Sequence, residues 1–136
     1  MKTNKMKNPT TLKLRGTRKK IMVADDDPGI LDATKIMLEE AGYEVETTVD
    51  GAVVRDVHEE YPDLILLDIW MSSMNGTDIC KHLKSNKLTK HIPIIMFSAN
   101  KDTEKIAKVA GADDFLAKPF QMEQLLVKVA EYVLTK

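Results

Sequence analysis

The stretch LILLDIW (64–70) places a single carboxylate at the end of an apolar run, and it largely decides the fold. Its first four residues are apolar without alternation, which is typical of a strand covered on both faces in a parallel sheet. A carboxylate is costly to bury unless it is paired or hydrogen-bonded. We therefore expect Asp68 to lie at the carboxyl end of this strand, where open parallel sheets bind ligands.

Composition and charge indicate one ordinary domain preceded by a basic segment. The chain has 136 residues, of which 43% are hydrophobic and 30% are charged, so it can bury a real core. Residues 1–20 contain eight Lys or Arg and no acid, whereas residues 21–136 contain twelve bases and 21 acids. We expect residues 1–19 to form a flexible basic tail and residues 20–136 to form the folded domain.

The sequence also argues against secreted and membrane-spanning classes of protein. No apolar stretch approaches the roughly 18 residues of a membrane span, and the N-terminus lacks the apolar core of a signal peptide. Cys80 is the only cysteine, so no intrachain disulfide can form. These features favour a cytoplasmic protein.

Apolar runs predict the strands of the domain. Continuous runs indicate central strands, and the alternating run YEVET (43–47) indicates an edge strand exposed on one side. The predicted strands cover residues 21–24, 43–47, 64–67, 92–97 and 115–117, and Asp68 follows directly after the third.

Amphipathic segments that separate or follow these runs predict five helices. The first begins after Asp27, a good N-cap, with Pro28 at the first helical position, and it ends at Gly42. We expect its apolar face to comprise Ile30, Ala33, Met37 and Ala41, widened by Leu31, Ile36 and Leu38. The next three helices cover 51–60, 77–86 and 102–110, and the last carries the stripe Met122, Leu125, Leu126, Val129 and Val133.

Alternating strands and helices predict an α/β fold with a parallel sheet covered on both faces. With the alternating strand at an edge, we expect a flavodoxin-like, doubly wound sheet of five strands in the order 2-1-3-4-5. Strands 1 and 3 are then neighbours at the point where the strand order reverses.

Candidate site residues follow the carboxyl ends of the predicted strands. We expect Asp25, Asp26 and Asp68 to meet there, with Ser98 and Lys118 beside them. Carboxylates so close repel one another unless a hard cation joins them, and oxygen-only ligands indicate Mg²⁺ or Mn²⁺ rather than zinc. A lysine charge and a serine hydroxyl suit phosphate oxygens. The pattern therefore indicates phosphoryl chemistry with an aspartate acceptor.

Four motifs in this order resemble the receiver domain of two-component response regulators. They are IMVADDD (21–27), LILLDIW (64–70), PIIMFSA (93–99) and DDFLAKPF (113–120). Each motif alone is modest, but the four together at these spacings are highly specific, and the resemblance covers about residues 19–136. It implies that the chain accepts a phosphoryl group from a sensor histidine kinase or a histidine phosphotransfer protein.

The resemblance also implies which residues bind the metal and accept the phosphoryl group. Asp68 corresponds to the phosphoacceptor. Asp26 and Asp68 correspond to direct Mg²⁺ ligands, Asp25 acts partly through water, and the backbone carbonyl of Trp70 supplies a further ligand.

Three other positions are implied to bind the phosphoryl group and respond to it. Lys118 matches the phosphate-binding lysine, and its bond to Pro119 is expected to be cis. Ser98 occupies the hydroxyl switch position and Phe115 the aromatic one. Phosphorylation is expected to draw Ser98 inward, to let the Phe115 ring follow, and to rearrange the last two helices and the fifth strand.

The sequence departs from the usual family pattern near the acceptor. Ser72 and Ser73 stand where Pro-Gly is common, and Phe115 lacks a tyrosine hydroxyl. Trp70 is bulky where small or polar residues are common, and with Asn100 it flanks the path of a hydrolytic water. Our hypothesis is that Trp70 and Asn100 modulate the lifetime of the aspartyl phosphate.

No output domain follows Lys136 in the sequence, which favours a stand-alone receiver. We therefore expect no DNA-binding domain, and a downstream protein that docks on the last two helices and the fifth strand. Two alternatives remain: a degenerate receiver that serves as a phosphorylation-independent scaffold, and a Mg²⁺-dependent phosphohydrolase of the haloacid-dehalogenase type. The latter family reads DxDx[TV], whereas residues 25–29 read DDDPG.

Overall fold

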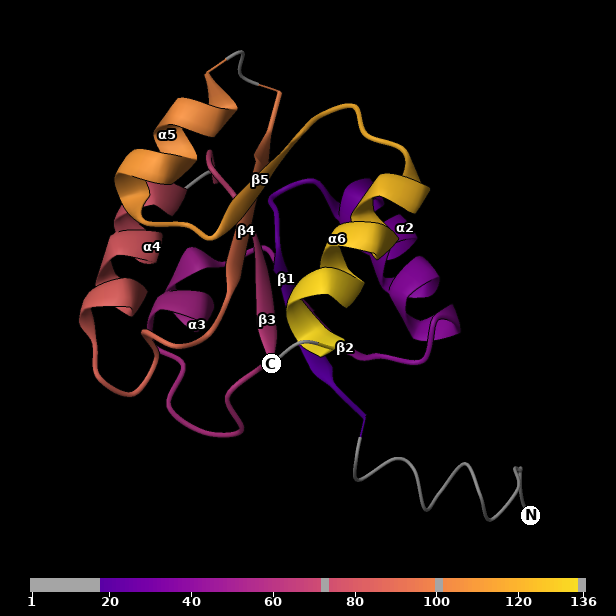
Figure 1. Cartoon of the computed structure of the whole chain (residues 1–136), viewed down its shortest axis with the longest axis horizontal. Coiled ribbons are helices and arrows are strands. Elements are labelled where there is room, and N and C mark those ends of the chain that lie inside the picture. The colour runs from indigo at the N-terminus through magenta and orange to yellow at the C-terminus, as the bar shows by residue number, and fades with distance from the viewer. Residues whose placement is uncertain (1–17, 72–73, 100–101, 135–136) are drawn as a thin grey trace.

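The core of the computed structural model is a single sheet of parallel strands (Figure 1). The structure describes residues 18–71, 74–99 and 102–134, so most of the predicted tail, Ser72, Ser73 and Asn100 lie outside it. The strands are β1 (Lys20–Ala24), β2 (Glu44–Thr48), β3 (Leu64–Asp68), β4 (Ile94–Ser98) and β5 (Asp114–Ala117). Their order is β2-β1-β3-β4-β5, which confirms the predicted order.

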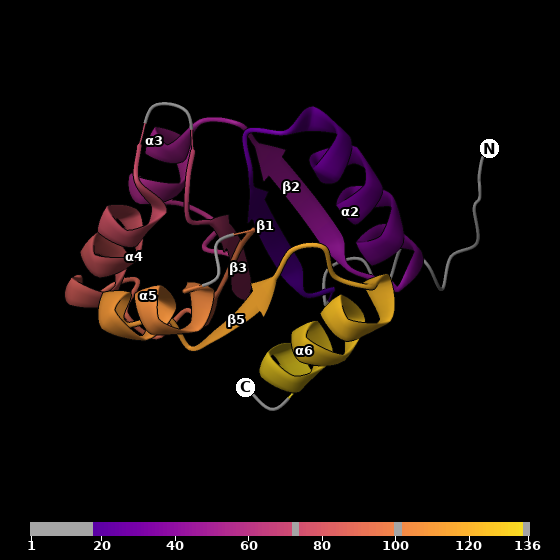
Figure 2. The ribbon, with the colours of Figure 1, turned by 90° about the horizontal axis from the view of Figure 1, so that it is seen from above.

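Helices cover both faces of this sheet. The described part of the chain contains α2 (Pro28–Glu40), α3 (Gly51–Arg55), α4 (Gly76–Ser85), α5 (Thr103–Ala110) and α6 (Met122–Leu134). Seen from above, α2 and α6 lie on one face and α3, α4 and α5 on the other (Figure 2). None of these helices has the length and apolar character that a membrane span requires.

The unbroken apolar run of β3 is explained by this double cover. Ile65 and Leu67 pack into the core cluster that includes residues of α4 and α5, whereas Leu64 and Leu66 pack into the cluster of α2 and α6. All five residues of β3 are buried. In β2, by contrast, only Val45 is buried, as expected for an edge strand.

Local signals set most of the helix ends. The Asp27 side chain caps α2 by accepting from the N–H groups of Gly29 and Ile30, at 2.9 and 3.4 Å. Gly111 ends α5 in the left-handed conformation, with φ of 90°.

Two helix predictions need correction. The helix predicted over 51–60 ends at Arg55, and Glu60 adopts a left-handed φ of 45° before the next strand. In α2 the buried stripe is Leu31, Thr34 and Leu38, whereas Ala33 is exposed and Ile36 is 59% exposed. Leu31 and Leu38 belong to the predicted face and are buried, but Ala33 and Ile36 were wrongly included because they lie on the helix surface outside the core.

Candidate functional site

Three carboxylates converge at the carboxyl ends of β1 and β3. These strands are direct neighbours, with Ala24 opposite Leu67, so Asp25 and Asp68 extend from adjacent strand ends. One oxygen from each of Asp25, Asp26 and Asp68 lies within 4.8 Å of the other two. Asp25 is fully buried and Asp68 is 5% exposed, whereas Asp26 is exposed. The structure thus brings together the three acidic residues predicted from the sequence.

Lys118 joins this cluster from the end of β5. Its Nζ donates to Asp25 Oδ2 at 2.8 Å and lies 3.8 Å from Asp68 Oδ1. The ammonium also lies 5.0 Å from the centroid of the Phe97 ring. The Lys118–Pro119 peptide bond is cis, as expected. One cation therefore contacts both buried carboxylates.

The surroundings of Asp68 shift its pKa. Burial, followed by the charge of Asp25, raises the pKa of Asp68 from 3.8 to about 6, although Lys118 opposes the shift. The Trp70 N–H, 3.5 Å from Asp68 Oδ1, also favours the ionised form. One lysine does not fully compensate these carboxylates, and an additional cation would bring the raised pKa of Asp68 down.

The donor set suits a hard divalent cation. Asp25, Asp26 and Asp68 offer oxygen atoms, the ligands that Mg²⁺ prefers in proteins. Asp27 has a different role, because its Oδ1 caps α2 and its N–H donates to Asp25 Oδ1 at 2.9 Å. The Asp27 capping role predicted from the sequence is confirmed.

Ser98 lies at the end of β4, beside the strand that carries Lys118. It pairs with Ala117 in the sheet, and its carbonyl oxygen accepts from the Lys118 N–H at 2.9 Å. The same carbonyl accepts from the Thr103 hydroxyl at 3.4 Å, and both Ser98 and Thr103 are buried. The backbone of Ser98 thus links β4, β5 and the start of α5.

Trp70 and Phe115, two other predicted site residues, lie in different surroundings. Trp70 is 53% exposed and forms an isolated antiparallel bridge with Asn75. Phe115 is partly buried on β5 and packs against the core cluster on the α4 and α5 face.

Gly76 is a structural residue of the site that sequence reasoning missed. A Cβ at this position would collide with the carbonyl oxygen of Asp68 and would lie 3.0 Å from the Ile69 Cα. The Gly76 N–H also donates to the Ile69 carbonyl at 2.7 Å. The lack of a side chain at Gly76 lets the start of α4 approach the backbone of Asp68 and Ile69.

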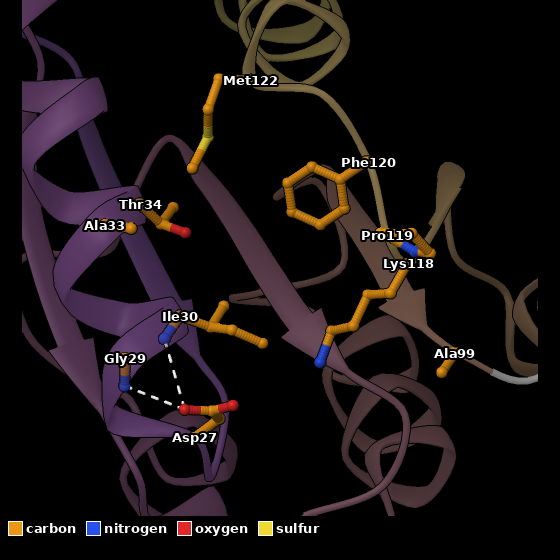
Figure 3. Close-up of a pocket in the computed structure, with 10 residues that line it drawn as sticks. All are labelled: Asp27, Gly29, Ile30, Ala33, Thr34, Ala99, Lys118, Pro119, Phe120 and Met122. Atoms are coloured by element: carbon orange, nitrogen blue, oxygen red, sulfur yellow. Dashed lines mark hydrogen bonds between the residues drawn. The ribbon is translucent and has the colours of Figure 1, made fainter.

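A cavity of about 520 Å³ lies beside Lys118, between α2 and the segment that leads into α6 (Figure 3). Ile30 and Ala33 line one side, and Phe120 and Met122 line the other. Its lining is mostly apolar and includes neither Asp25 nor Asp68. Asp25 and Asp68 therefore lie outside the lining of this cavity, although Lys118 belongs to it.

A parallel sheet of this order, with buried aspartates and a lysine at one edge, defines the receiver class. The profile of the response regulator receiver domain matches residues 21–130, so the chain belongs to this family of two-component signalling proteins.

Individual relatives agree with this assignment. The chain is 39% identical over 113 residues to the DNA-binding dual master transcriptional regulator RpaA of Synechocystis, a match to 81% of this chain and 47% of RpaA. It is 36% identical over 115 residues to the DNA-binding response regulator MtrA of Mycolicibacterium smegmatis, a match to 82% of this chain and 49% of MtrA. The structure of the chemotaxis response regulator CheY4 of Vibrio cholerae matches with a TM-score of 0.78 and 30% identity, covering 85% of this chain and 98% of CheY4.

These relatives overturn one prediction. The chain spans about half the length of RpaA and MtrA, and both are DNA-binding regulators. The prediction of a receiver that acts without a DNA-binding domain is therefore wrong. That prediction was based on Lys136 being the last residue of the sequence. The docking protein expected on α5, β5 and α6 was inferred from the same assumption.

Proposed function

We propose that Asp68 accepts a phosphoryl group in a reaction that requires a divalent cation, and that the domain signals by switching between two packings. The observation that carries this proposal is the position of Lys118, 2.8 Å from Asp25 and 3.8 Å from Asp68. A cation held beside the acceptor carboxylate is placed to neutralise phosphoryl oxygens as charge develops on them.

Asp25, Asp26 and Asp68 would hold Mg²⁺ or Mn²⁺, with the backbone carbonyl of Trp70 as a further ligand. Their oxygen chemistry, the mutual approach of the carboxylates and the raised pKa of Asp68 support this assignment. When bound, the ion supplies positive charge for the transferring phosphoryl group.

The donor is a nitrogen-linked phosphoryl group of the phosphohistidine type. An Asp68 oxygen attacks phosphorus, the new O–P bond forms as the P–N bond breaks, and the leaving imidazole nitrogen keeps the bonding electron pair. Lys118 and the Ser98 hydroxyl donate hydrogen bonds to the phosphoryl oxygens. Hydrolysis of the aspartyl phosphate then restores the free carboxylate.

Switching follows from the new acceptor atoms on Asp68. They attract the Ser98 hydroxyl at the end of β4, and the Phe115 ring on β5 moves into the space that this leaves. Because the phosphoryl group binds one packing better than the other, it shifts the population toward that packing. Trp70 and Asn100 set how fast water reaches the phosphoryl group.

Intact mass measurement tests the phosphoacceptor directly. Incubating the chain with Mg²⁺ and phosphoramidate is expected to add about 80 Da, one phosphoryl group, to the wild type and nothing to Asp68→Asn. Asp27→Asn is the matched control, since it changes a neighbouring carboxylate that caps α2, and Asn caps equally well. This control should be phosphorylated like the wild type.

Chelation of the metal provides the second arm. EDTA should abolish the adduct on the wild type, because the transfer needs the divalent ion. An adduct that persists on Asp68→Asn, or no adduct on the wild type with Mg²⁺ present, would contradict the proposal and favour a scaffold role.

A further inference from the structure

Lys128 reaches around the edge of the sheet to the Phe115 ring. Phe115 belongs to β5, an edge strand, and packs against the core on the face covered by α4 and α5. Lys128 belongs to α6, which covers the opposite face (Figure 2). Its Nζ nevertheless lies 5.9 Å from the centroid of the Phe115 ring, within the range of a cation–π contact.

Asp114 fixes both partners of this contact. Its Oδ2 accepts from Lys128 Nζ at 3.0 Å and from the Tyr132 hydroxyl at 3.0 Å, while its Oδ1 accepts from the Phe115 N–H at 2.8 Å. The side chains of Lys128 and Asp114 are 28% and 16% exposed, so the pair is partly open to water. A single carboxylate therefore holds both the backbone of Phe115 and the ammonium that covers its ring.

The charge on this carboxylate persists at neutral pH. Burial alone would raise the pKa of Asp114, but the hydrogen bonds from Phe115, Lys128 and Tyr132 outweigh it and hold that pKa below its ordinary value. At neutral pH Lys128 therefore faces an ionised carboxylate.

We propose that Lys128 is a positioning residue that stabilises the resting position of the Phe115 ring and thereby opposes the switch. The inference rests on the proposed function, because it names a residue that regulates the same site. A ring that moves toward Ser98 leaves the ammonium, whereas the Lys128–Asp114 ion pair does not depend on the ring. The cation–π contact therefore favours one packing over the other, which is what a population shift requires.

A simpler role is also consistent with a lysine at this place. Lysine on an edge strand or beside it discourages pairing with another sheet, and its ion pair adds stability. Such a role would change stability or association when Lys128 is replaced, but it would not change the affinity of the site for a phosphoryl mimic.

Titration with beryllium fluoride in the presence of Mg²⁺ separates these roles, with the fluorescence of Trp70, the single tryptophan, as the signal. Lys128→Met should bind about twofold to fivefold more tightly than the wild type, the factor expected from the loss of one exposed cation–π contact. Lys128→Gln should behave in the same way, and Lys128→Arg should restore wild-type affinity. Lys108→Met is the control, because Lys108 forms an exposed ion pair with Glu104 at 3.0 Å.

The resting contact has its own readout by NMR, without any ligand. Ring current from Phe115 should shift the Lys128 Hε protons upfield, and Phe115→Leu should remove that shift while Lys108 remains unchanged. Absence of the shift in the wild type would overturn the inference.

The outcomes distinguish the inference from the function it rests on. If the wild type binds beryllium fluoride and Lys128→Met binds it equally well, the inference fails and the proposed function stands. An Arg variant that behaves like Met also overturns it, since charge over the ring would then be irrelevant. If neither the wild type nor any variant binds, the proposed function fails and the inference with it.

Discussion

Replacing Asp68 with Asn should stabilise the metal-free domain at neutral pH. The folded protein raises the pKa of this carboxyl from 3.8 to about 6, with burial as the first cause and the Asp25 charge as the second. Ionised Asp68 therefore destabilises the fold, whereas the neutral amide of Asn has nearly the same shape without the charge. A difference of about two pKa units corresponds to about 3 kcal/mol.

The sign follows from proton linkage. Between the two pKa values the folded state binds the proton more tightly than the unfolded state, so wild-type stability falls as the pH rises through about 6. The stability of Asp68→Asn does not fall in this way, because the amide does not ionise. Its advantage over the wild type should be about 1 kcal/mol near pH 4.5 and about 3 kcal/mol at pH 8, because all other carboxyls are shared by the two proteins.

Urea unfolding in EDTA across this pH range measures the difference. Adding Mg²⁺ should then raise the midpoint of the wild type more than that of the variant, since the ion binds the folded carboxylates. A variant that is less stable than the wild type at pH 8, or a difference that does not change with pH, would refute the reasoning about the buried charge.

Three further substitutions test other parts of the site. Lys118→Met leaves the fully buried Asp25 without its cation and should destabilise the domain by about 3 kcal/mol in urea unfolding; a wild-type midpoint would show that this ion pair is not needed for stability. Gly76→Ala should lower the unfolding free energy by about 1–3 kcal/mol through its backbone collision, whereas Gly29→Ala, whose Cβ would meet only a side-chain oxygen at 3.3 Å, should have a smaller effect. Trp70→Asn should change the rate at which the phosphorylated domain loses its adduct, followed by intact mass; an unchanged rate would exclude the screening role of the indole.

The central strands and the site could be predicted because their signals are local and strong. Continuous apolar runs mark strands buried on both faces, and the polar residues that end them must share one edge of a parallel sheet. The approach of Asp25 to Asp68 follows from the strand order, and the long side chain of Lys118 reaches them across β4.

Features that depend on tertiary packing could not be predicted in this way. The apolar face of α2 was misjudged because Ile36 is compatible with helical periodicity yet points to solvent. The need for Gly76 arises from a backbone approach between segments that the sequence does not show as adjacent. Lys128 and Phe115 are in contact although α6 and the Phe115 ring lie on opposite faces of the sheet, and hydrophobic periodicity in the sequence does not indicate such a contact.

The hydrogen bond between Lys118 and Asp25 joins residues 93 positions apart in the chain. A nascent polypeptide that has completed β1 and β3 already carries all three aspartates, but it lacks the lysine that compensates them until β5 has been synthesised and docked. Under the proposed function, the site therefore becomes complete only after β5 has joined the sheet.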